Sequence, residues 1–207
     1  MKPDVLMIQM PHNPISMYYR GRIEESWSGY NVKYFDAVTP ETMDNLGYLR
    51  FAKKRDVCEF TETEKATWYS HVECWAMARR KPLLIIEHDA MLDEPIDDDL
   101  WGQHDIICFG RQRKGSPSHQ TVSPFGRGRP PKAPFGSQLA ASAYYLTPNV
   151  AKKLVSRAKK EGVGRKGIDV NPDCHIHEFC DKLGVWRTQH VYQLVERGIG
   201  TTIKHNR

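Results

Sequence analysis

Two carboxylates separated by a single residue, Glu87 and Asp89, directly follow an unbroken apolar run at residues 83–86. Such a run is typical of a central strand covered on both faces, and ligands of open α/β sheets bind at the edge where such strands end. Two carboxylates at that edge can hold a hard divalent cation, which also takes phosphate oxygens as ligands. The pattern therefore indicates a cation site for a phosphorylated ligand. A solvated acidic turn, extended by the acidic residues at 93–99, is the alternative interpretation.

The apolar run is preceded by a segment with the marks of a helix. Thr61 and Glu64 have the spacing of a capping box, in which each side chain accepts a hydrogen bond from the other residue's backbone N–H. Apolar residues then recur at helical spacing, namely Trp68, Val72, Trp75 and Ala76. Pro82 ends the pattern. We therefore expect a helix with one face packed inward to lead into the strand that carries the two carboxylates.

The chain before and after this segment alternates between strand and helix patterns. An apolar strand at residues 5–8, a helical pattern at 15–27 and a strand at 31–38 predict a β-α-β unit with parallel pairing. The later segments, in chain order, are a strand at 104–110, a strand at 139–146, a helix from Pro148 to near Gly162, a helix from Pro172 to 183, and one or two closing strands at 185–194. We predict an α/β fold with a mostly parallel central sheet flanked by helices.

Length and composition are consistent with a single intracellular domain. A chain of 207 residues with 40% hydrophobic content can bury a sizeable core, and we expect one domain over residues 1–207. No apolar run approaches the roughly 20 residues that a membrane-spanning helix needs, and the N-terminus lacks the pattern of a secretory signal. The five cysteines are scattered and odd in number, which favours reduced thiols. We therefore expect a cytoplasmic protein.

Positive charge is concentrated in two segments, although the net charge is only +5. Residues 111–132 hold six Lys or Arg and no Asp or Glu, and residues 152–166 hold seven against Glu161 alone. The first segment is also rich in Pro and Gly, so we predict a flexible basic loop at about residues 111–137. Such segregation favours a polyanionic partner, such as a pyrophosphate, a nucleic acid or an anionic glycan. A solvated basic surface without a partner is the alternative.

A group of Cys and His residues near the C-terminus raises the question of a zinc site. Cys174, His175, His177 and Cys180 fall on the helix predicted from Pro172, where Cys180 lies on the apolar stripe while Cys174 and His175 point elsewhere. Four zinc ligands must converge tetrahedrally, which disfavours a closed structural site. A single histidine from this helix, or His205 from the C-terminal tail, could instead reach a metal in the active site.

In their order along the chain, these segments resemble glycosyltransferase family twenty-five, which includes lipooligosaccharide sugar transferases and collagen galactosyltransferases. The similar motifs are VKYFDAV at 32–38, YSH at 69–71 followed by Trp75, LIIEHD at 84–89, SAYYLTP at 142–148, IDV at 168–170 and TTI at 201–203. Two features depart from the family. His88 replaces the central Asp of an acidic triplet, which keeps the outer carboxylates of a D-x-D-type pattern, and the basic Pro/Gly loop has no counterpart that we can place.

The resemblance implies a GT-A fold, a Rossmann-like α/β domain that binds a nucleotide-sugar donor, usually a UDP-sugar, together with Mn²⁺ or Mg²⁺. The implied reaction moves a hexose to an acceptor hydroxyl with inversion at the anomeric carbon. Asp89 is the implied metal ligand, with Glu87 on the metal or on the ribose, and His205 of the C-terminal tail is a further candidate ligand. The remaining residues expected to contact the donor are Pro11, Asn13, Ser70, His71, Arg111 and Arg113.

Asp169 is the candidate catalytic base. An inverting transfer needs a carboxylate that takes the proton of the acceptor hydroxyl in line with the leaving group, and Asp169 lies in the IDV motif that resembles the family. The alternative role of Asp169 is structural, as a carboxylate at a helix entry that stabilises the turn at Asn171.

The acceptor is the least determined part of the sequence interpretation. Related phage enzymes glycosylate hydroxylated pyrimidines, and the basic segments suit DNA. One hypothesis is therefore a phage-encoded enzyme that transfers the sugar to a hydroxylated base of DNA in the cytoplasm of the host cell. A phosphorylated glycan, such as a lipopolysaccharide or lipooligosaccharide core, is the alternative acceptor. A protein of another class, a nucleic-acid-binding module without catalysis, would use the same positive charge.

Overall fold

The computed structural model describes residues 2–51, 60–111, 142–163, 176 and 186–193. In chain order, the elements are β1 (Asp4–Gln9), α1 (Pro14–Ser26), β2 (Val32–Asp36), α2 (Pro40–Met43), α3 (Glu62–Ala78), β3 (Leu83–Glu87), β4 (Ala90–Leu92), a 3-10 turn η1 (Asp98–Leu100), β5 (Ile106–Arg111), β6 (Ala143–Leu146), α4 (Pro148–Glu161) and β7 (Trp186–Gln193). The basic loop beyond Arg111 lies outside the described residues, and so does the helix expected from Pro172 apart from Ile176, which is helical and buried as predicted.

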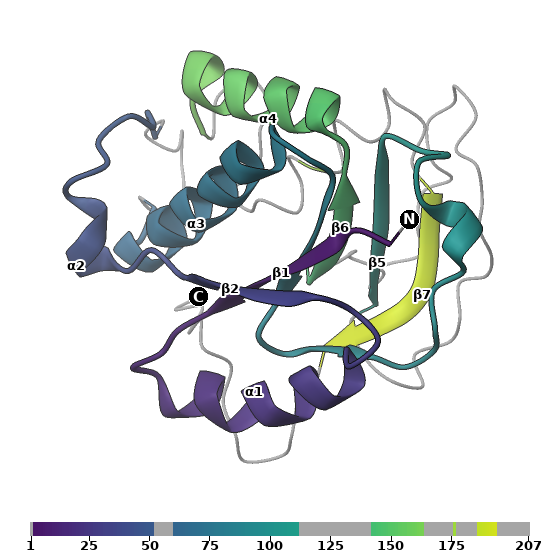
Figure 1. Ribbon diagram of the computed structural model, residues 1–207. Coiled ribbons are helices and arrows are strands. Elements are labelled where there is room, and N and C mark those ends of the chain that lie inside the picture. Colours follow the sequence, from purple (N-terminus) through teal and green to yellow (C-terminus); the bar gives the residue numbers. More distant parts are fainter. Residues whose placement is uncertain (1, 52–59, 112–141, 164–175, 177–185, 194–207) are drawn as a thin grey trace, which may run out of the picture.

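The strands form one seven-stranded sheet in the order β2-β1-β3-β6-β5-β7-β4 (Figure 1). β1 pairs in parallel with β2 and β3, and β5 pairs in parallel with β7. β6 is antiparallel to both β3 and β5, and β4 is antiparallel to β7. All strands except β6 and β4 therefore run in one direction, which confirms the expected α/β fold with a mostly parallel sheet.

Helices cover both faces of the sheet, α1 on one face and α3 with α4 on the other (Figure 1). Alternate residues of the central strands point to opposite faces. Leu6 and Ile85 join the apolar cluster under α3 and α4, whereas Met7 and Ile86 join the cluster that contains Ile23 of α1. This two-sided burial explains why β1 and β3 read as unbroken apolar runs rather than as alternating patterns.

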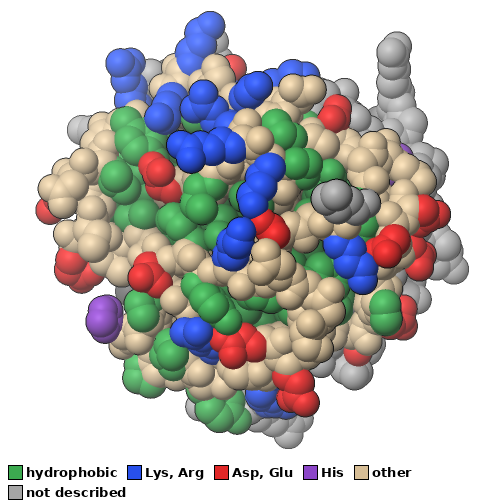
Figure 2. Space-filling view, in the orientation of Figure 1, with side chains coloured by type: hydrophobic (Ala, Val, Ile, Leu, Met, Phe, Trp, Pro, Cys, Tyr) green, Lys and Arg blue, Asp and Glu red, His purple; other side chains and the backbone are tan. Residues whose placement is uncertain are grey.

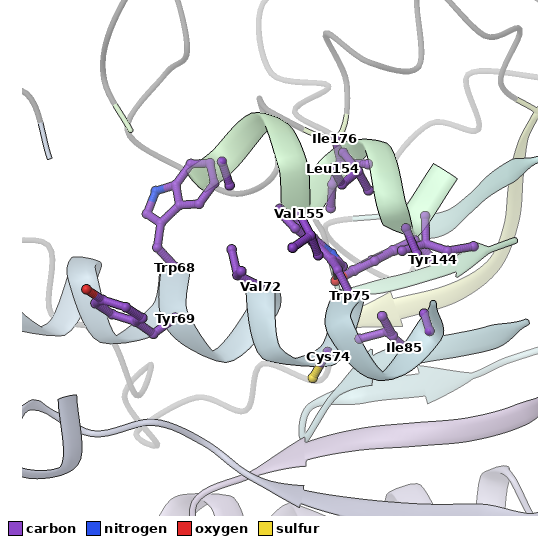
Figure 3. Packing of buried hydrophobic residues seen from close by; sticks show 14 of the residues in the cluster. Trp68, Tyr69, Val72, Cys74, Trp75, Ile85, Tyr144, Leu154, Val155 and Ile176 are labelled. Atoms are coloured by element: carbon purple, nitrogen blue, oxygen red, sulfur yellow. Dashed lines mark hydrogen bonds between the residues drawn. The ribbon is translucent and has the colours of Figure 1, made fainter. Parts of the chain in front are cut away.

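Helix α3 begins where the capping box predicted and is buried more completely than expected. The Thr61 Oγ1 atom accepts a hydrogen bond from the Glu64 N–H, and the Glu64 carboxylate accepts one from the Thr61 N–H. The expectation of a single inward face was too narrow, because α3 packs against α4 as well as against the sheet (Figure 3). Trp68 and Val72 point toward α4, while Cys74 points away from it (Figure 3).

Strand β4 is an element that the sequence patterns did not predict. Residues after Asp89 read as an acidic turn, but Ala90–Leu92 pair with β7, a partner about one hundred residues later in the chain. Local periodicity carries no information about such pairing. The Trp27 Nε1–H at the end of α1 also donates to the Ala90 carbonyl at 2.8 Å. As a result, Asp89 lies in the two-residue turn between two strands, with its Oδ1 atom buried.

Helix α4 has the amphipathic character that the sequence predicted. Val150, Leu154 and Val155 are buried against α3, and four lysines on the opposite side are exposed: Lys152, Lys153, Lys159 and Lys160. The helix ends at Gly162, whose backbone has a positive φ of 74°. None of the helices in the described part of the chain combines the length and apolar character needed to span a bilayer.

We expect Gly162→Ala to destabilise the protein by about 1–3 kcal/mol, because the φ value is unfavourable for residues with a side chain. An added Cβ would also lie 2.6 Å from the Arg50 carbonyl oxygen, which accepts a hydrogen bond from the Val163 N–H. Urea unfolding would measure the loss. Gly29→Ala is the matched control, since a Cβ at Gly29 meets nothing within 4 Å. Equal stability of the two variants would contradict the prediction.

Candidate active site

The carboxyl ends of β1, β2 and β3 meet at one edge of the sheet and bring three polar side chains together. Gln9 of β1 is in register with Asp36 of β2, and Ile8 is in register with Glu87 of β3. The chain leaves β1 through α1 on one face and returns from β2 to β3 through α3 on the other (Figure 1). The strand order β2-β1-β3 therefore creates a topological switch point between β1 and β3, where ligands of open α/β sheets bind.

Glu87 and Asp89 lie at this switch point in different environments. The Glu87 side chain is 26% exposed, whereas the Asp89 Oδ1 atom is buried without a hydrogen-bond partner among the described residues. Burial and the nearby negative charge of Glu87 raise the pKa of Asp89 to about 8. His88 between them is buried, and burial lowers its pKa. Near neutral pH, His88 therefore adds no positive charge to balance the carboxylates.

The two carboxylates fit a hard divalent cation. A buried carboxylate oxygen without a partner and a raised carboxyl pKa are typical of a site whose negative charge a bound cation would balance. Mn²⁺ and Mg²⁺ prefer oxygen ligands and usually keep several sites for water or phosphate. No group of three or more His, Cys, Asp or Glu side chains with metal-binding geometry occurs among the residues that the structure describes. His205 lies outside them.

His71 and Ser70, both predicted to contact the donor, are buried on α3 beneath the edge of the sheet. His71 is 2% exposed, and its Nε2 atom lies 3.5 Å from Glu87 Oε1. The Ser70 hydroxyl donates to the Ala66 carbonyl and accepts from the Val38 N–H at 2.9 Å. Its single proton is thus committed within α3, and the contact with Val38 fixes the segment that follows β2. Donor contact by Ser70 and His71 remains a prediction.

The start of α1 contains Pro11 and Asn13, the other two predicted donor contacts in the described part of the chain. Asn13 is the N-cap, and its Oδ1 atom accepts from the N–H groups of Ile15 and Ser16. The Ser16 hydroxyl in turn accepts from the Met10 N–H at 2.9 Å. Pro11 is exposed in the turn between β1 and α1. Both predicted residues therefore lie at the carboxyl end of β1, and their contact with a donor remains a prediction.

Arg111 is the last residue of β5, which runs in the same direction as β3. The backbone of Arg111 therefore lies toward the same edge of the sheet as Glu87. Arg113 and Asp169, like His205, lie outside the described residues, so the predicted phosphate contact and the predicted base remain predictions.

Sequence reasoning missed several polar residues at this edge. Gln9 is buried, its Nε2 donates to Asp36 Oδ1 at 2.8 Å, and its Oε1 atom has no partner among the described residues. The Ser142 carbonyl accepts a hydrogen bond from the Glu87 N–H, and the buried Ser142 hydroxyl likewise has no partner among the described residues. Gln9 carried a usable signal, since it is a polar residue that ends an apolar strand as Glu87 does. Ser142 could be placed only by the β3–β6 pairing.

Comparison with known proteins relates the chain to others through its fold. Neither a protein-family model nor a curated protein matches the sequence. The inositol-1-phosphate CTP transferase from T. maritima is a similar solved structure, with a TM-score of 0.53 and 12% identity over 96% of this chain and 91% of that one. At this identity the likeness concerns the fold alone.

Two glycosyltransferase structures also align over most of the chain, with lower TM-scores. One is a glycosyltransferase involved in the glycosylation of the major capsid of PBCV-1, with a TM-score of 0.49 and 10% identity over 94% of this chain and 96% of that one. The other is the galactosyltransferase LgtC in complex with donor and acceptor sugar analogs, with a TM-score of 0.42 and 12% identity over 89% of this chain and 72% of that one.

Proposed function

We propose that the chain is a metal-dependent glycosyltransferase with a GT-A fold, which moves a hexose from a nucleotide-sugar, with UDP as the expected nucleotide, to an acceptor hydroxyl. The observation that carries the proposal is the pair of Glu87 and Asp89 at the switch point, with a buried Asp89 oxygen that has no partner among the described residues. The motif resemblance to glycosyltransferase family twenty-five supports it. So does the fold shared with a transferase whose named substrate, CTP, is also a nucleotide.

The residues at the edge have separate roles in this proposal. Asp89 and Glu87 would hold Mn²⁺ or Mg²⁺, which would bind the donor diphosphate. When bound, the cation supplies positive charge where negative charge develops on the leaving diphosphate. Gln9 and Asp36 offer polar groups to the nucleoside at the ends of β1 and β2. Arg111 and Arg113 add positive charge at the phosphates.

Asp169 remains our candidate for the base of an inverting transfer. In that role its carboxylate takes the proton of the acceptor hydroxyl as the acceptor oxygen bonds to the anomeric carbon and the bond from that carbon to the diphosphate oxygen breaks. The proposal for Asp169 comes from the IDV motif alone.

Titration of the purified protein with a panel of nucleotide-sugars, followed by calorimetry, tests the proposal. We expect at least one UDP-sugar to bind in the presence of Mn²⁺ and to lose affinity when EDTA is added. The proposal would be overturned if the protein bound none of the nucleotide-sugars in the presence of Mn²⁺ but bound DNA tightly and with a strong salt dependence. That result would favour the nucleic-acid-binding module instead.

For the acceptor we propose a polyanion, and among polyanions DNA that carries a hydroxylated base. Lys and Arg side chains gather over α4 on one face of the molecule (Figure 2), and four lysines of this helix are exposed. Such a surface attracts phosphates of DNA and of a phosphorylated lipopolysaccharide core alike. The two acceptors differ in salt dependence, because only DNA releases many counterions on binding.

We expect the combined variant Lys152→Gln, Lys153→Gln and Lys160→Gln to reduce the salt dependence of DNA binding. Each phosphate contact that is lost lowers the slope of log K against log salt concentration by about 1. Fluorescence anisotropy with labelled hydroxymethylated DNA at several salt concentrations measures the slope. Lys159 is left in place because its ammonium group lies over the Tyr48 ring at 4.3 Å.

Lys2→Gln is the control for this experiment, since Lys2 contacts Tyr30 and Asp98 rather than α4. An unchanged slope in the triple variant would contradict a role for α4. Transfer to a phosphorylated oligosaccharide without any transfer to hydroxymethylated DNA would show that the acceptor is the glycan.

A further inference from the structure

Three buried side chains form a continuous polar line that ends at Glu87. The Trp75 Nε1–H donates to the Tyr144 hydroxyl at 2.9 Å. That hydroxyl lies 2.7 Å from His71 Nδ1, and His71 Nε2 lies 3.5 Å from Glu87 Oε1. The Trp75 and Tyr144 side chains meet between α3 and the sheet (Figure 3). Each of the three residues is at least 98% buried.

Hydrogen-bond chemistry gives this line a direction. An indole N–H can only donate, so the Tyr144 oxygen accepts from Trp75 and its own proton is available for His71 Nδ1. Burial raises the pKa of the Tyr144 phenol well above its usual range, so the hydroxyl keeps that proton. With Nδ1 as an acceptor, the His71 ring carries its proton on Nε2, which faces the Glu87 carboxylate.

The line joins two sequence motifs that have no role in the proposed reaction to the acidic motif that carries it. His71 and Trp75 belong to the helix motif, Tyr144 to the SAYYLTP motif, and Glu87 to the acidic motif. The surrounding core is apolar, and phenylalanine or leucine could fill the same space without the cost of burying polar groups. Because burying these polar groups costs stability, their presence indicates that the Glu87 carboxylate at the end of the line requires them.

We propose that Trp75, Tyr144 and His71 are positioning residues that fix the orientation of the Glu87 carboxylate at the switch point. This inference rests on the proposed function, in which Glu87 contacts the cation or the donor. Glu87 is the last residue of β3, and its backbone is held by the bond from its N–H to the Ser142 carbonyl at 2.8 Å. The line from α3 and β6 adds a constraint on its side chain, as partners of metal ligands commonly do.

The principal test measures Mn²⁺ binding by electron paramagnetic resonance, without donor or acceptor. The Glu87→Gln variant shows how much Mn²⁺ affinity is lost when the carboxylate itself is removed. We expect Tyr144→Phe and His71→Asn to weaken Mn²⁺ binding by roughly 10–100-fold, the usual effect of removing a partner of a ligand. His71→Gln should bind Mn²⁺ more tightly than His71→Asn, because the glutamine amide reaches the position of Nε2 whereas the asparagine amide reaches only that of Nδ1.

Tyr145→Phe is the matched control. Tyr145 is the next residue of β6 and is equally buried, but it packs in the cluster on the opposite face of the sheet. A loss of Mn²⁺ affinity in Tyr144→Phe that Tyr145→Phe does not show supports the inference. If Glu87→Gln weakens Mn²⁺ binding while Tyr144→Phe behaves as Tyr145→Phe, the inference is overturned and the proposed function stands. If Glu87→Gln also binds Mn²⁺ and UDP-sugars as the unaltered protein does, both fail.

A second measurement uses the unaltered protein and therefore does not depend on the folding of a variant. Long-range ¹H–¹⁵N spectra of the protein labelled with ¹⁵N-histidine report which ring nitrogen of each histidine carries the proton. We expect the Nε2–H form for His71. A His71 ring that carries its only proton on Nδ1 would place an unprotonated nitrogen against the carboxylate, and the inference would be wrong.

Discussion

Asp89→Asn is expected to lower Mn²⁺-dependent hydrolysis of a bound UDP-sugar by more than roughly 100-fold, since a direct ligand matters at least as much as its supporting partners. The same substitution is expected to stabilise the cation-free protein near pH 8. The pKa of Asp89, about 8 in the folded protein, lies well above the ordinary value for aspartate. Its contribution to stability is therefore complete at pH values below about 4 and is lost as the pH rises through about 8.

Thermal unfolding of the cation-free protein at pH 5 and pH 8.5 tests the second half of this prediction. The unaltered protein should lose more stability between these pH values than Asp89→Asn, whose amide stays neutral, and Mn²⁺ should stabilise only the unaltered protein. Asp99→Asn, an exposed acidic residue of η1, is the control and should change neither property. Full donor hydrolysis in Asp89→Asn, or in the unaltered protein with EDTA, would exclude the proposed role of Asp89.

Trp27→Ala is expected to destabilise the protein by about 3–5 kcal/mol, the usual cost of removing a large buried aromatic side chain. Trp27 is fully buried where α1 ends, in the cluster that contains Met7 and Ile86. Its Nε1–H donates to the carbonyl of Ala90, the residue that follows Asp89. The indole therefore joins α1 to the backbone of the candidate cation site. Urea unfolding measures the loss of stability.

Trp27→Phe separates the hydrogen bond from the packing. It leaves the Ala90 carbonyl without its donor at an expected cost of about 1–3 kcal/mol. Trp101→Phe is the matched control, because the Trp101 Nε1 atom is buried without a partner among the described residues. A loss in Trp101→Phe as large as that in Trp27→Phe would contradict the role given to the Ala90 contact.

Features of the fold that depend on neighbouring residues could be predicted from the sequence. The capping box at Thr61, the apolar run of β3 and the apolar stripe of α4 each depend on residues within a few turns of one another, and all three are present in the structure. The two-sided burial of α3, the reversed direction of β6 and the existence of β4 depend on partners far along the chain. The periodicity of neighbouring residues does not indicate which distant segments will pack or pair with them.

The same distinction holds for the candidate site. Glu87 and Asp89 stood out because they follow one apolar strand, and the structure places them at the predicted edge of the sheet. Gln9 and Asp36 meet only because β1 and β2 are in register, and Tyr144 reaches His71 only because β6 lies beside β3. Sequence spacing identified residues with suitable chemistry, but it did not identify the residues that hold them in place.

The position of β6 also has a consequence for the order in which the protein can fold. β3 pairs with β6 across more than fifty intervening residues, and α3 remains uncovered on one side until α4 has been made. During synthesis, the β-α-β unit of β1, α1 and β2 can form early, but Trp68 and Val72 stay exposed to the surroundings until the ribosome has added residues 143–161. Non-local pairing of this kind slows folding and leaves apolar surface open to association with other chains. The folding of the region around Glu87 is thus completed late, when β6 pairs with β3 and α4 packs on α3.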